Sequence, residues 1–161
     1  MYTRIGFGFD VHEFAAGRPL ILGGVSIPHE AGLAGHSDAD AVLHAIVDAM
    51  LGGAGLGDIG GQFPDTDPEH KDQDSRVFLT SVYRLIREHD FSIGNIDVTI
   101  VTQEPRIRPY VEQMRINIAA DLEIGSDRVN IKATTTENLG FIGRKEGLAA
   151  WAVVALLSAT D

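Results

Sequence analysis

The segment at residues 147–159 (GLAAWAVVALLSA) restricts the fold most, because it is apolar along its whole length. Its alanines favour a helix. Read as a strand, it places Leu148 and Val154 on one side and Trp151 and Val153 on the other, so both sides need cover. If helices cover one face, a second subunit is the candidate for the other face. The residues alone leave both interpretations open.

The rest of the chain alternates between strand and helix patterns, which indicates an α/β or α+β fold. A length of 161 residues fits one domain spanning residues 1–161. Strands are expected at residues 3–9, at 19–27 as a hairpin, at 96–102 and at 129–134. Helices are expected at 37–51 with Ser37 as N-cap, after Asp74, and from about 110 to 123. Residues 52–68 read as a long loop rich in Gly, Asp and Pro, of a length typical of functional loops.

Composition restricts the chemistry that the chain can perform. There is no cysteine, so any metal must be held by His, Asp or Glu. The formal net charge is −10, which argues against a nucleic-acid binder. A phosphate substrate would therefore need local positive charge from metal ions, backbone N–H groups or helix N-termini. No signal-peptide stretch or membrane-length apolar run is present, so we expect a cytoplasmic protein.

The first candidate metal ligands are Asp10 and His12. Residues i and i+2 of an extended chain point to the same side, so this carboxylate and imidazole project together. A third ligand from a packed helix would complete a zinc site with one open position, and His44 is the candidate. A hydrogen-bonded core histidine is an equally good interpretation of His44. A lone D-x-H pair is by itself a weak signal.

Three further segments carry candidate binding groups. His36 and Ser37 begin an expected helix, whose N-terminus favours an anion, although Ser37 could serve only as a cap. Asp58 and its loop could bind sugar hydroxyls or form a surface turn. The run from Thr134 to Glu137, with Arg144 beyond it, suits a diphosphate and a hard cation such as Mg²⁺, but equally fits a strand end and turn. The remaining histidines are expected at the surface: His29, His70 and His89.

Taken together, these motifs resemble one family across nearly the whole chain, the methylerythritol cyclodiphosphate synthases. The matching stretches are RIGFGFDVH near the start, AGHSDADAVLHAIVDAMLGGAGLGDIGGQFPDTDP in the middle, and KATTTENLGFIGRKEG near the end. Each motif is weak alone, whereas the set at these separations is highly specific. The resemblance implies conversion of 4-diphosphocytidyl-2-C-methyl-D-erythritol 2-phosphate to the cyclic 2,4-diphosphate, with release of CMP.

The resemblance also implies roles for individual residues. One zinc ion per subunit would be held by Asp10, His12 and His44, and Mg²⁺ or Mn²⁺ by Glu137. His36 and Thr135 would stabilise the transition state. The other substrate-binding residues would be Ser37, Asp58, Ile59, Gly60, Phe63, Pro64, Asp65, Thr66, Asp67, Thr134, Thr136, Phe141 and Arg144. The cytidine would be bound by Thr102, Gln103, Glu104, Pro105, Arg106, Ile107, Arg108 and Ala133.

The family fold implied by the resemblance is a small domain with helices on one face of a mixed four-stranded sheet, assembled as a homotrimer with active sites between subunits. This favours the strand interpretation of residues 147–159. Members also bind an isoprenyl diphosphate in the trimer cavity, for which Phe9, Phe141 and Arg144 are candidates here. Two positions depart from the family: Asn138 replaces a common lysine, and Trp151 stands where some members have an acid. A bacterial cytosol and a plastid stroma both fit.

Two alternatives use the same residues. The open zinc position could activate water, which would make the chain a zinc-dependent phosphohydrolase. A non-catalytic isoprenoid-diphosphate-binding trimer is the other alternative, although such a protein would not need the three zinc ligands that are present.

Overall fold

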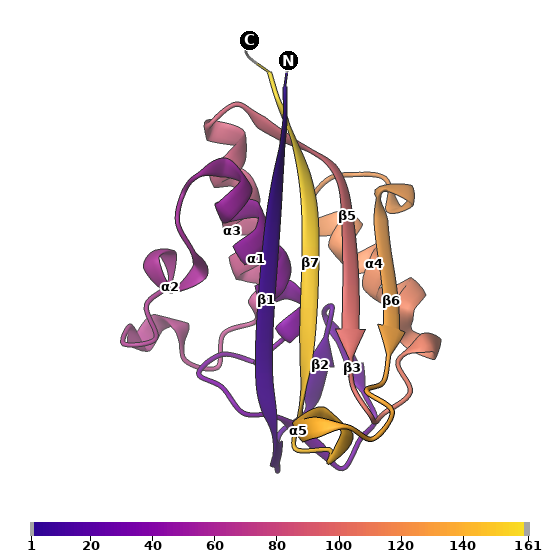
Figure 1. Ribbon diagram of the computed structural model, residues 1–161. Helices are drawn as coiled ribbons and strands as arrows, with labels where there is room; N and C mark the ends of the chain where they lie inside the picture. Colours follow the sequence, from indigo (N-terminus) through magenta and orange to yellow (C-terminus); the bar gives the residue numbers. More distant parts are fainter. Residues whose placement is uncertain (1, 160–161) are drawn as a thin grey trace.

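A mixed β-sheet forms the centre of the molecule in the computed structural model, which describes residues 2–159 (Figure 1). Strand β7 (Gly147–Ser158) lies between β1 (Thr3–Ala16) and β5 (Phe91–Val101) and runs antiparallel to both. Strand β6 (Val129–Thr134) pairs with β5 in parallel. These four strands form the predicted mixed sheet. In the described part of the chain, β4 (Ala31–Leu33) adds a short fifth strand beside β1.

The central position of β7 explains why its alanine-rich sequence is a strand. A full-length partner on each side gives every residue a place in a hydrogen-bonded ladder, and this outweighs the helix propensity of alanine. Leu148, Ala152 and Leu156 face the helices and are completely buried. The strand interpretation of this segment is thus confirmed.

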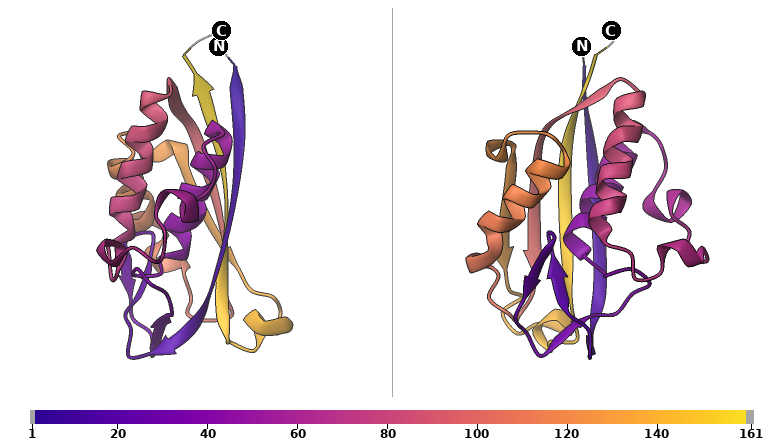
Figure 2. Two further views of the ribbon diagram at one scale, coloured as in Figure 1. Left: turned by 90° about the vertical axis from the view of Figure 1, so that its left-hand side faces the viewer. Right: turned by 180° about the vertical axis from the view of Figure 1, so that it is seen from behind.

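Three helices cover one face of the sheet: α1 (Ala41–Ala54), α3 (Ser75–Glu88) and α4 (Val111–Asp121) (Figure 2). Helix α1 packs directly against β1 because two glycines leave room for its backbone. A Cβ atom at Gly6 would lie 1.7 Å from the Ala49 carbonyl oxygen, and one at Gly8 would lie 1.9 Å from that of Ala45. The close approach of α1 brings its side chains over β1.

The remaining elements are short and lie at the ends and edges of these layers. They are β2 (Leu20–Leu22), β3 (Val25–Ile27), α2 (Ile59–Gln62), η1 (Pro68–His70), η2 (Arg108–Tyr110), η3 (Ser126–Arg128) and α5 (Gly140–Gly143). Strands β2 and β3 form the hairpin predicted around Gly23 and Gly24. In residues 2–159 no helix has both the length and the apolar character needed to cross a membrane.

The start of α1 corrects one prediction. Ser37 is not the N-cap, because Asp40 caps the helix by accepting a hydrogen bond from Leu43 N at 3.1 Å. Ala39 takes a left-handed conformation with φ of 57°, which separates Ser37 from the helix by a turn. The buried Asp40 carboxylate also accepts from Gly23 N and Gly24 N of the hairpin. His36 and Ser37 therefore lie before the helix rather than at its N-terminus.

The opposite face of the sheet remains largely uncovered. Ile5 and Phe7 of β1 are 64% and 62% exposed, although both alternate with glycines that are buried beneath α1. Phe9, Val11 and Val153 add to this apolar surface. Among the described helices, α5 is the one that lies on this side, at the lower end of the sheet in the left view of Figure 2. An exposed apolar face of this kind is a candidate interaction surface.

Candidate functional site

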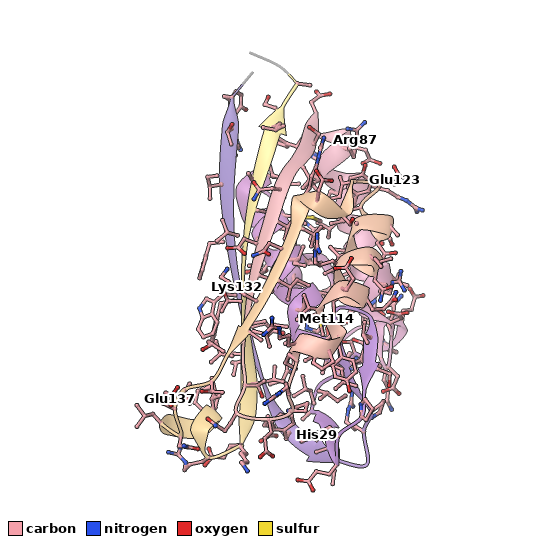
Figure 3. The ribbon with its side chains drawn as sticks, turned by 90° about the vertical axis from the view of Figure 1, so that its right-hand side faces the viewer. His29, Arg87, Met114, Glu123, Lys132 and Glu137 are labelled. Atoms are coloured by element: carbon pink, nitrogen blue, oxygen red, sulfur yellow. The ribbon has the colours of Figure 1, made fainter. Side chains whose placement is uncertain are left out.

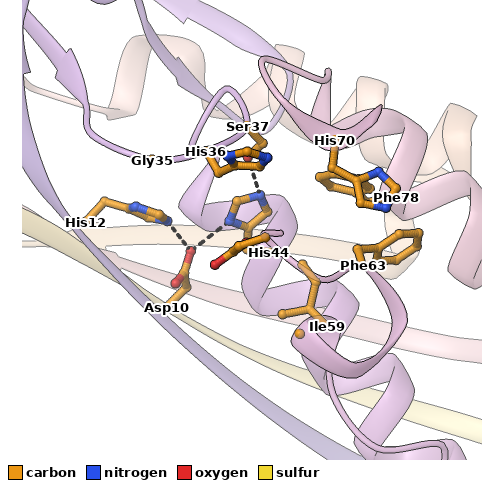
Figure 4. Close-up of a pocket in the computed structure, with 12 residues that line it drawn as sticks. Asp10, His12, Gly35, His36, Ser37, His44, Ile59, Phe63, His70 and Phe78 are labelled. Atoms are coloured by element: carbon orange, nitrogen blue, oxygen red, sulfur yellow. Dashed lines mark hydrogen bonds and ion pairs between the residues drawn. The ribbon is translucent and has the colours of Figure 1, made fainter. Parts of the chain in front are cut away.

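Asp10, His12 and His44 converge on one point between β1 and α1 (Figure 4). The i, i+2 spacing turns Asp10 and His12 toward the helix, and the close approach of α1 places His44 above them. Asp10 Oδ2 lies 2.8 Å from His12 Nε2 and 3.1 Å from His44 Nδ1. The candidate ligand atoms all lie within 4.8 Å of one another. Three side chains from two elements therefore form one cluster.

In each imidazole, the ring nitrogen that points away from Asp10 is also within hydrogen-bond distance of another group. His12 Nδ1 lies 2.7 Å from the Ala34 carbonyl oxygen, which can only accept, so Nδ1 carries a proton. His44 Nε2 lies 2.8 Å from Ser75 Oγ and 3.2 Å from Ser37 Oγ. These contacts leave His12 Nε2 and His44 Nδ1 as the two ring atoms that face Asp10.

The ionisation of Asp10 and His12 follows from their contact. Burial alone raises the pKa of Asp10, but hydrogen bonds from His12 and His44 outweigh it and lower that pKa below its ordinary value. Burial alone lowers the pKa of His12, but the hydrogen bond and charge of Asp10 outweigh it and raise that pKa. A divalent cation would take the place of the protons that now join these groups.

The residues present fit a zinc ion. Two imidazole nitrogens and one carboxylate oxygen form a donor set that zinc commonly takes, with one tetrahedral position left open. Bonds of about 2.0–2.1 Å place tetrahedral ligand atoms roughly 3.3 Å apart. The observed contacts of 2.8 and 3.1 Å need to open by only a few tenths of an ångström. Among residues 2–159 this is the one cluster of three or more such ligands.

A cavity of about 260 Å³ opens beside this cluster. Its lining includes nine predicted site residues: Asp10, His12, His36, Ser37, His44, Ile59, Gly60, Phe63 and Asp65. Gly35, His70 and Phe78 also line it and were not predicted. His70 was expected at the surface, but its ring packs 5.6 Å from the rings of both Phe63 and Phe78. The sequence signal that could have identified Phe78 as a lining residue is its position just after the Asp74 cap. From that position its ring points back toward the loop that carries Phe63.

The wall formed by α2 is held by two aspartates. Asp58 caps α2 by accepting from Gly61 N at 2.8 Å. Asp48 of α1 accepts from Ile59 N at 2.8 Å, so the wall is tied to the helix that carries His44. Farther along, the Asp67 carbonyl oxygen lies 3.3 Å from His36 Nε2. Pro64 and Thr66 belong to the same connection but are outside the cavity lining.

A second pocket of about 380 Å³ lies at the carboxyl ends of the parallel strands β5 and β6. It is lined by the eight residues predicted to bind cytidine, from Thr102 to Arg108 and Ala133, together with Thr134 and Thr135. Ligands commonly bind at this end of parallel strands, where turns present free backbone groups. Its lining carries two arginines, Arg106 and Arg108, and one glutamate, Glu104.

The turn after β6 carries the remaining predicted residues. Thr134, Thr135 and Glu137 are exposed, and Glu137 N donates to Thr135 Oγ1 at 3.1 Å. Figure 3 shows Glu137 on this turn beside α5. Phe141 lies on α5, and Arg144 follows it in an exposed ion pair with Glu146. Glu137 belongs to no ligand cluster in the described part of the chain, so any cation there would need ligands from a substrate or water.

The two pockets lie toward opposite edges of the sheet. The first lies on β1, and the second lies at β5 and β6, with β7 between them. Neighbouring strands are about 4.8 Å apart, so β1 and β6 are separated by roughly 14 Å. The resemblance implied the members of each group, and the structure shows that the two groups lie apart within one chain.

The comparisons with known proteins cover nearly the whole chain. Residues 3–157 match the YgbB family. The chain is 60% identical over 153 residues to a 2-C-methyl-D-erythritol 2,4-cyclodiphosphate synthase of Bacillus cereus, covering 95% of this chain and 97% of that one. The fold matches the CDP complex of IspF from Plasmodium falciparum with a TM-score of 0.87 at 33% identity, over 99% of this chain and 100% of the other. It also matches the bifunctional IspDF of Campylobacter jejuni with a TM-score of 0.94 at 47% identity, over 98% of this chain but only 42% of that one.

Proposed function

Because this chain belongs to the YgbB family, we propose that it converts 4-diphosphocytidyl-2-C-methyl-D-erythritol 2-phosphate to 2-C-methyl-D-erythritol 2,4-cyclodiphosphate and CMP. It is a cyclodiphosphate synthase of the methylerythritol phosphate pathway to isoprenoids, and its reaction is that of a phosphorus–oxygen lyase. The convergence of Asp10, His12 and His44 beside a cavity is the observation that carries the proposal. Neither the phosphohydrolase nor the non-catalytic alternative has support among the relatives.

Asp10, His12 and His44 would hold one zinc ion per subunit. When bound, zinc supplies a Lewis acid that polarises a phosphoryl oxygen and orients it. The donor set and the hydrogen bonds behind each imidazole support this assignment. The protein's own contribution would be a preformed set of three ligands that line the cavity.

The cavity residues would fold the substrate so that its 2-phosphate reaches the β-phosphorus of its diphosphate. The nucleophile is already an anion, so the residues need to position it and shield charge rather than remove a proton. His36 and Ser37 on one wall and the 58–67 connection on the other support this role by enclosing the cavity. His36 would also stabilise the charge that develops during transfer.

The second pocket would bind the cytidine, and the turn after β6 would bind the diphosphate. The Thr134–Thr136 hydroxyls and backbone groups supply donors there, with Thr135 placed to stabilise the transition state. Glu137 would hold Mg²⁺ or Mn²⁺ through one carboxylate, while phosphate oxygens and water complete the shell. The cytidine would serve as a binding handle remote from the reacting atoms.

We propose a homotrimer in which each active site joins the first pocket of one subunit to the second pocket of its neighbour. Two observations support it: the uncovered apolar face of β1 and β7, and the position of the pockets toward opposite edges of one chain. An isoprenyl diphosphate in the trimer cavity would use Phe9, Phe141 and Arg144. Titration with farnesyl diphosphate tests that binding, and the absence of heat or density would end it. The bacterial relatives support a cytoplasmic location.

Phosphorus NMR of the purified chain with substrate, zinc and Mg²⁺ tests the reaction. We expect a cyclic diphosphate and CMP in equal amounts, with no oxygen incorporated from H₂¹⁸O. A linear phosphate carrying solvent oxygen would contradict the proposal and support a phosphohydrolase.

Mixing two impaired variants tests the shared site, with the residual activity of each variant alone as the background. His44→Ala removes the metal half of a site, and Glu137→Ala removes the diphosphate half. Random mixed trimers then contain intact sites at about one quarter of positions. Return of activity to about that level supports the shared site, whereas no recovery after denaturation and mixed refolding contradicts it.

A further inference from the structure

We infer that Ser75 and Asp38 are positioning residues that orient His44 toward the metal by a hydrogen-bonded relay from its Nε2 atom. The inference rests on the metal site proposed above. It concerns two residues that lie outside the cavity lining, one at the start of α3 and one in the turn before α1.

The direction of the relay follows from its donors. His44 Nδ1 faces Asp10 at 3.1 Å, so a bound metal would occupy Nδ1 and leave the proton on Nε2. That proton points to Ser75 Oγ at 2.8 Å. Ser75 Oγ in turn donates a hydrogen bond to Asp38 Oδ1. The imidazole is therefore joined through one hydroxyl to a carboxylate.

Asp38 is itself fixed by backbone groups. Its Oδ2 accepts from Ser75 N at 3.0 Å and its Oδ1 accepts from Asp40 N at 3.1 Å. Its own N–H donates to the Gln73 carbonyl oxygen at 3.2 Å. Asp38 thus connects the turn before α1 to the start of α3. The His44 ring contacts this connection at Ser75.

Ser75 suits this role better than Ser37, the other hydroxyl near His44. The contact of Ser37 Oγ with His44 Nε2 is longer, at 3.2 Å, and the same oxygen accepts from Ala39 N. Ser37 also lines the cavity, whereas Ser75 is completely buried and has Asp38 behind it. Support of this kind behind a metal-bound histidine fixes its ring and raises its basicity.

Zinc affinity of the full-length protein, measured by competition with a chromophoric chelator, tests the relay. We expect Ser75→Ala to bind zinc about 10- to 100-fold more weakly, the range found when such supporting contacts are removed. The visible spectrum of the Co²⁺-substituted protein should change as well, because the His44 ring is freed. Asp38→Asn retains one acceptor oxygen and should show a smaller loss.

Asp74→Ala is the matched control. Asp74 caps α3 by accepting from Arg76 N at 2.9 Å but does not touch His44. This change should lower the thermal midpoint of the apoprotein and leave zinc affinity within about twofold of wild type. Equal loss in Asp74→Ala and Ser75→Ala would show that loosening of α3 is the cause, and would overturn the relay.

The outcomes separate the two proposals. Failure of the wild-type chain to bind zinc through Asp10, His12 and His44 would overturn both the metal site and the relay. If wild-type protein binds zinc there and Ser75→Ala binds it equally well, the relay alone is overturned. Should Ser75→Ala fail to fold, the affinity of Asp38→Asn decides: wild-type affinity rejects the relay, and a loss supports it.

Discussion

The two pockets of this chain are built in different ways. At the first pocket, Asp10, His12 and His44 already contact one another, and each imidazole is held from behind by Ala34 or Ser75. At the second, most of the lining comes from the connection that follows β5, and Thr135 of the lining and nearby Glu137 are exposed. The first pocket is organised by contacts among its own side chains, whereas the second is bordered by exposed side chains.

This difference indicates where binding and catalysis depend on the fold. A side chain that is already fixed before the substrate binds costs little entropy to order. Its substitution should therefore lower the reaction rate strongly. An exposed turn acquires its order from the ligand, the cation and the neighbouring subunit, so single changes there should have smaller effects. Graded substitutions across the two regions test this.

The largest effect is expected at the first pocket. His44→Ala should abolish zinc retention and lower the rate about a thousandfold or more, because it removes a ligand and with it several kcal/mol of Lewis-acid stabilisation. Bound metal, measured by mass spectrometry, and turnover should fall together in a folded protein. His89→Ala is the control, since the exposed His89 ring bonds to the Leu85 carbonyl oxygen of α3 and does not line the first pocket. Full activity in zinc-free His44→Ala protein would refute the ligand assignment.

The second-largest effect is expected at the proposed subunit interface, where the first pocket of one subunit would meet the second pocket of its neighbour. Phe7→Asp places a charge on the uncovered sheet face without touching either pocket, and a charge buried without a partner costs several kcal/mol. We expect subunits to separate and activity to fall about a hundredfold at protein concentrations where they are apart. Light scattering and activity against protein concentration measure this. Val77→Asp, on an exposed apolar residue of α3, should change neither, and a trimeric, active Phe7→Asp protein would contradict the shared site.

Residue patterns alone singled out candidates in the first region and in the turn after β6, whereas the cytidine residues of the second pocket came only from the family resemblance. The spacing of Asp10 and His12 placed both side chains on one face of a strand, and that is where the structure has them. His44 remained open on residue evidence, because a core histidine and a ligand share the same helical face. Its assignment needed the contact between α1 and β1, which the glycines at 6 and 8 permit but which no local pattern specifies.

Other features depended on contacts between distant segments. The central place of β7 results from pairing with β1 and β5, which are remote in sequence, so alanine propensity alone left it ambiguous. Ser37 lost the cap to Asp40 because the hairpin at Gly23 and Gly24 adds two donors to that carboxylate. His70 entered the cavity wall by stacking with Phe63 and Phe78. The roles of the exposed residues after β6 stay predictions.

A smaller effect is expected at the second pocket. Glu137→Ala should lower the rate about 10- to 100-fold and raise the Mg²⁺ concentration needed for half-maximal activity, while zinc content stays unchanged. The reason is that one carboxylate among several oxygen ligands is lost. Glu123→Ala is a matched control, because both glutamates are exposed at positive φ, 53° for Glu137 and 52° for Glu123. An unchanged Mg²⁺ dependence in Glu137→Ala would contradict the assignment of a cation site to this turn.

The smallest effect should appear in the pH dependence of stability. Asp40 at the start of α1 and Asp97 on β5 should change the unfolding free energy in opposite directions and over different pH ranges. Complete burial raises the pKa of Asp40 from 3.8 to about 6, against the lowering effect of its backbone hydrogen bonds, and the charge of Asp38 adds to the rise. The native state then binds more protons than the unfolded state between about pH 4 and 6, so the stability that Asp40 contributes is lost as the pH rises through 6.

Wild-type protein should therefore gain about 1 kcal/mol of unfolding free energy relative to Asp40→Asn when the pH is lowered from 7 to 5. Urea unfolding of both metal-free proteins measures this difference, and the titration of Asp10 and His12 cancels between them. Asp97 on β5 is the contrast: partial burial raises its pKa, but hydrogen bonds from Lys132 and Asn130 outweigh that and lower it. The stability from Asp97 is lost only below its ordinary value of 3.8, so the difference between wild type and Asp97→Asn should stay flat from pH 7 to 5. A flat difference for Asp40→Asn as well would mean that the carboxylate at the start of α1 stays ionised throughout this range, stabilised by its three backbone donors.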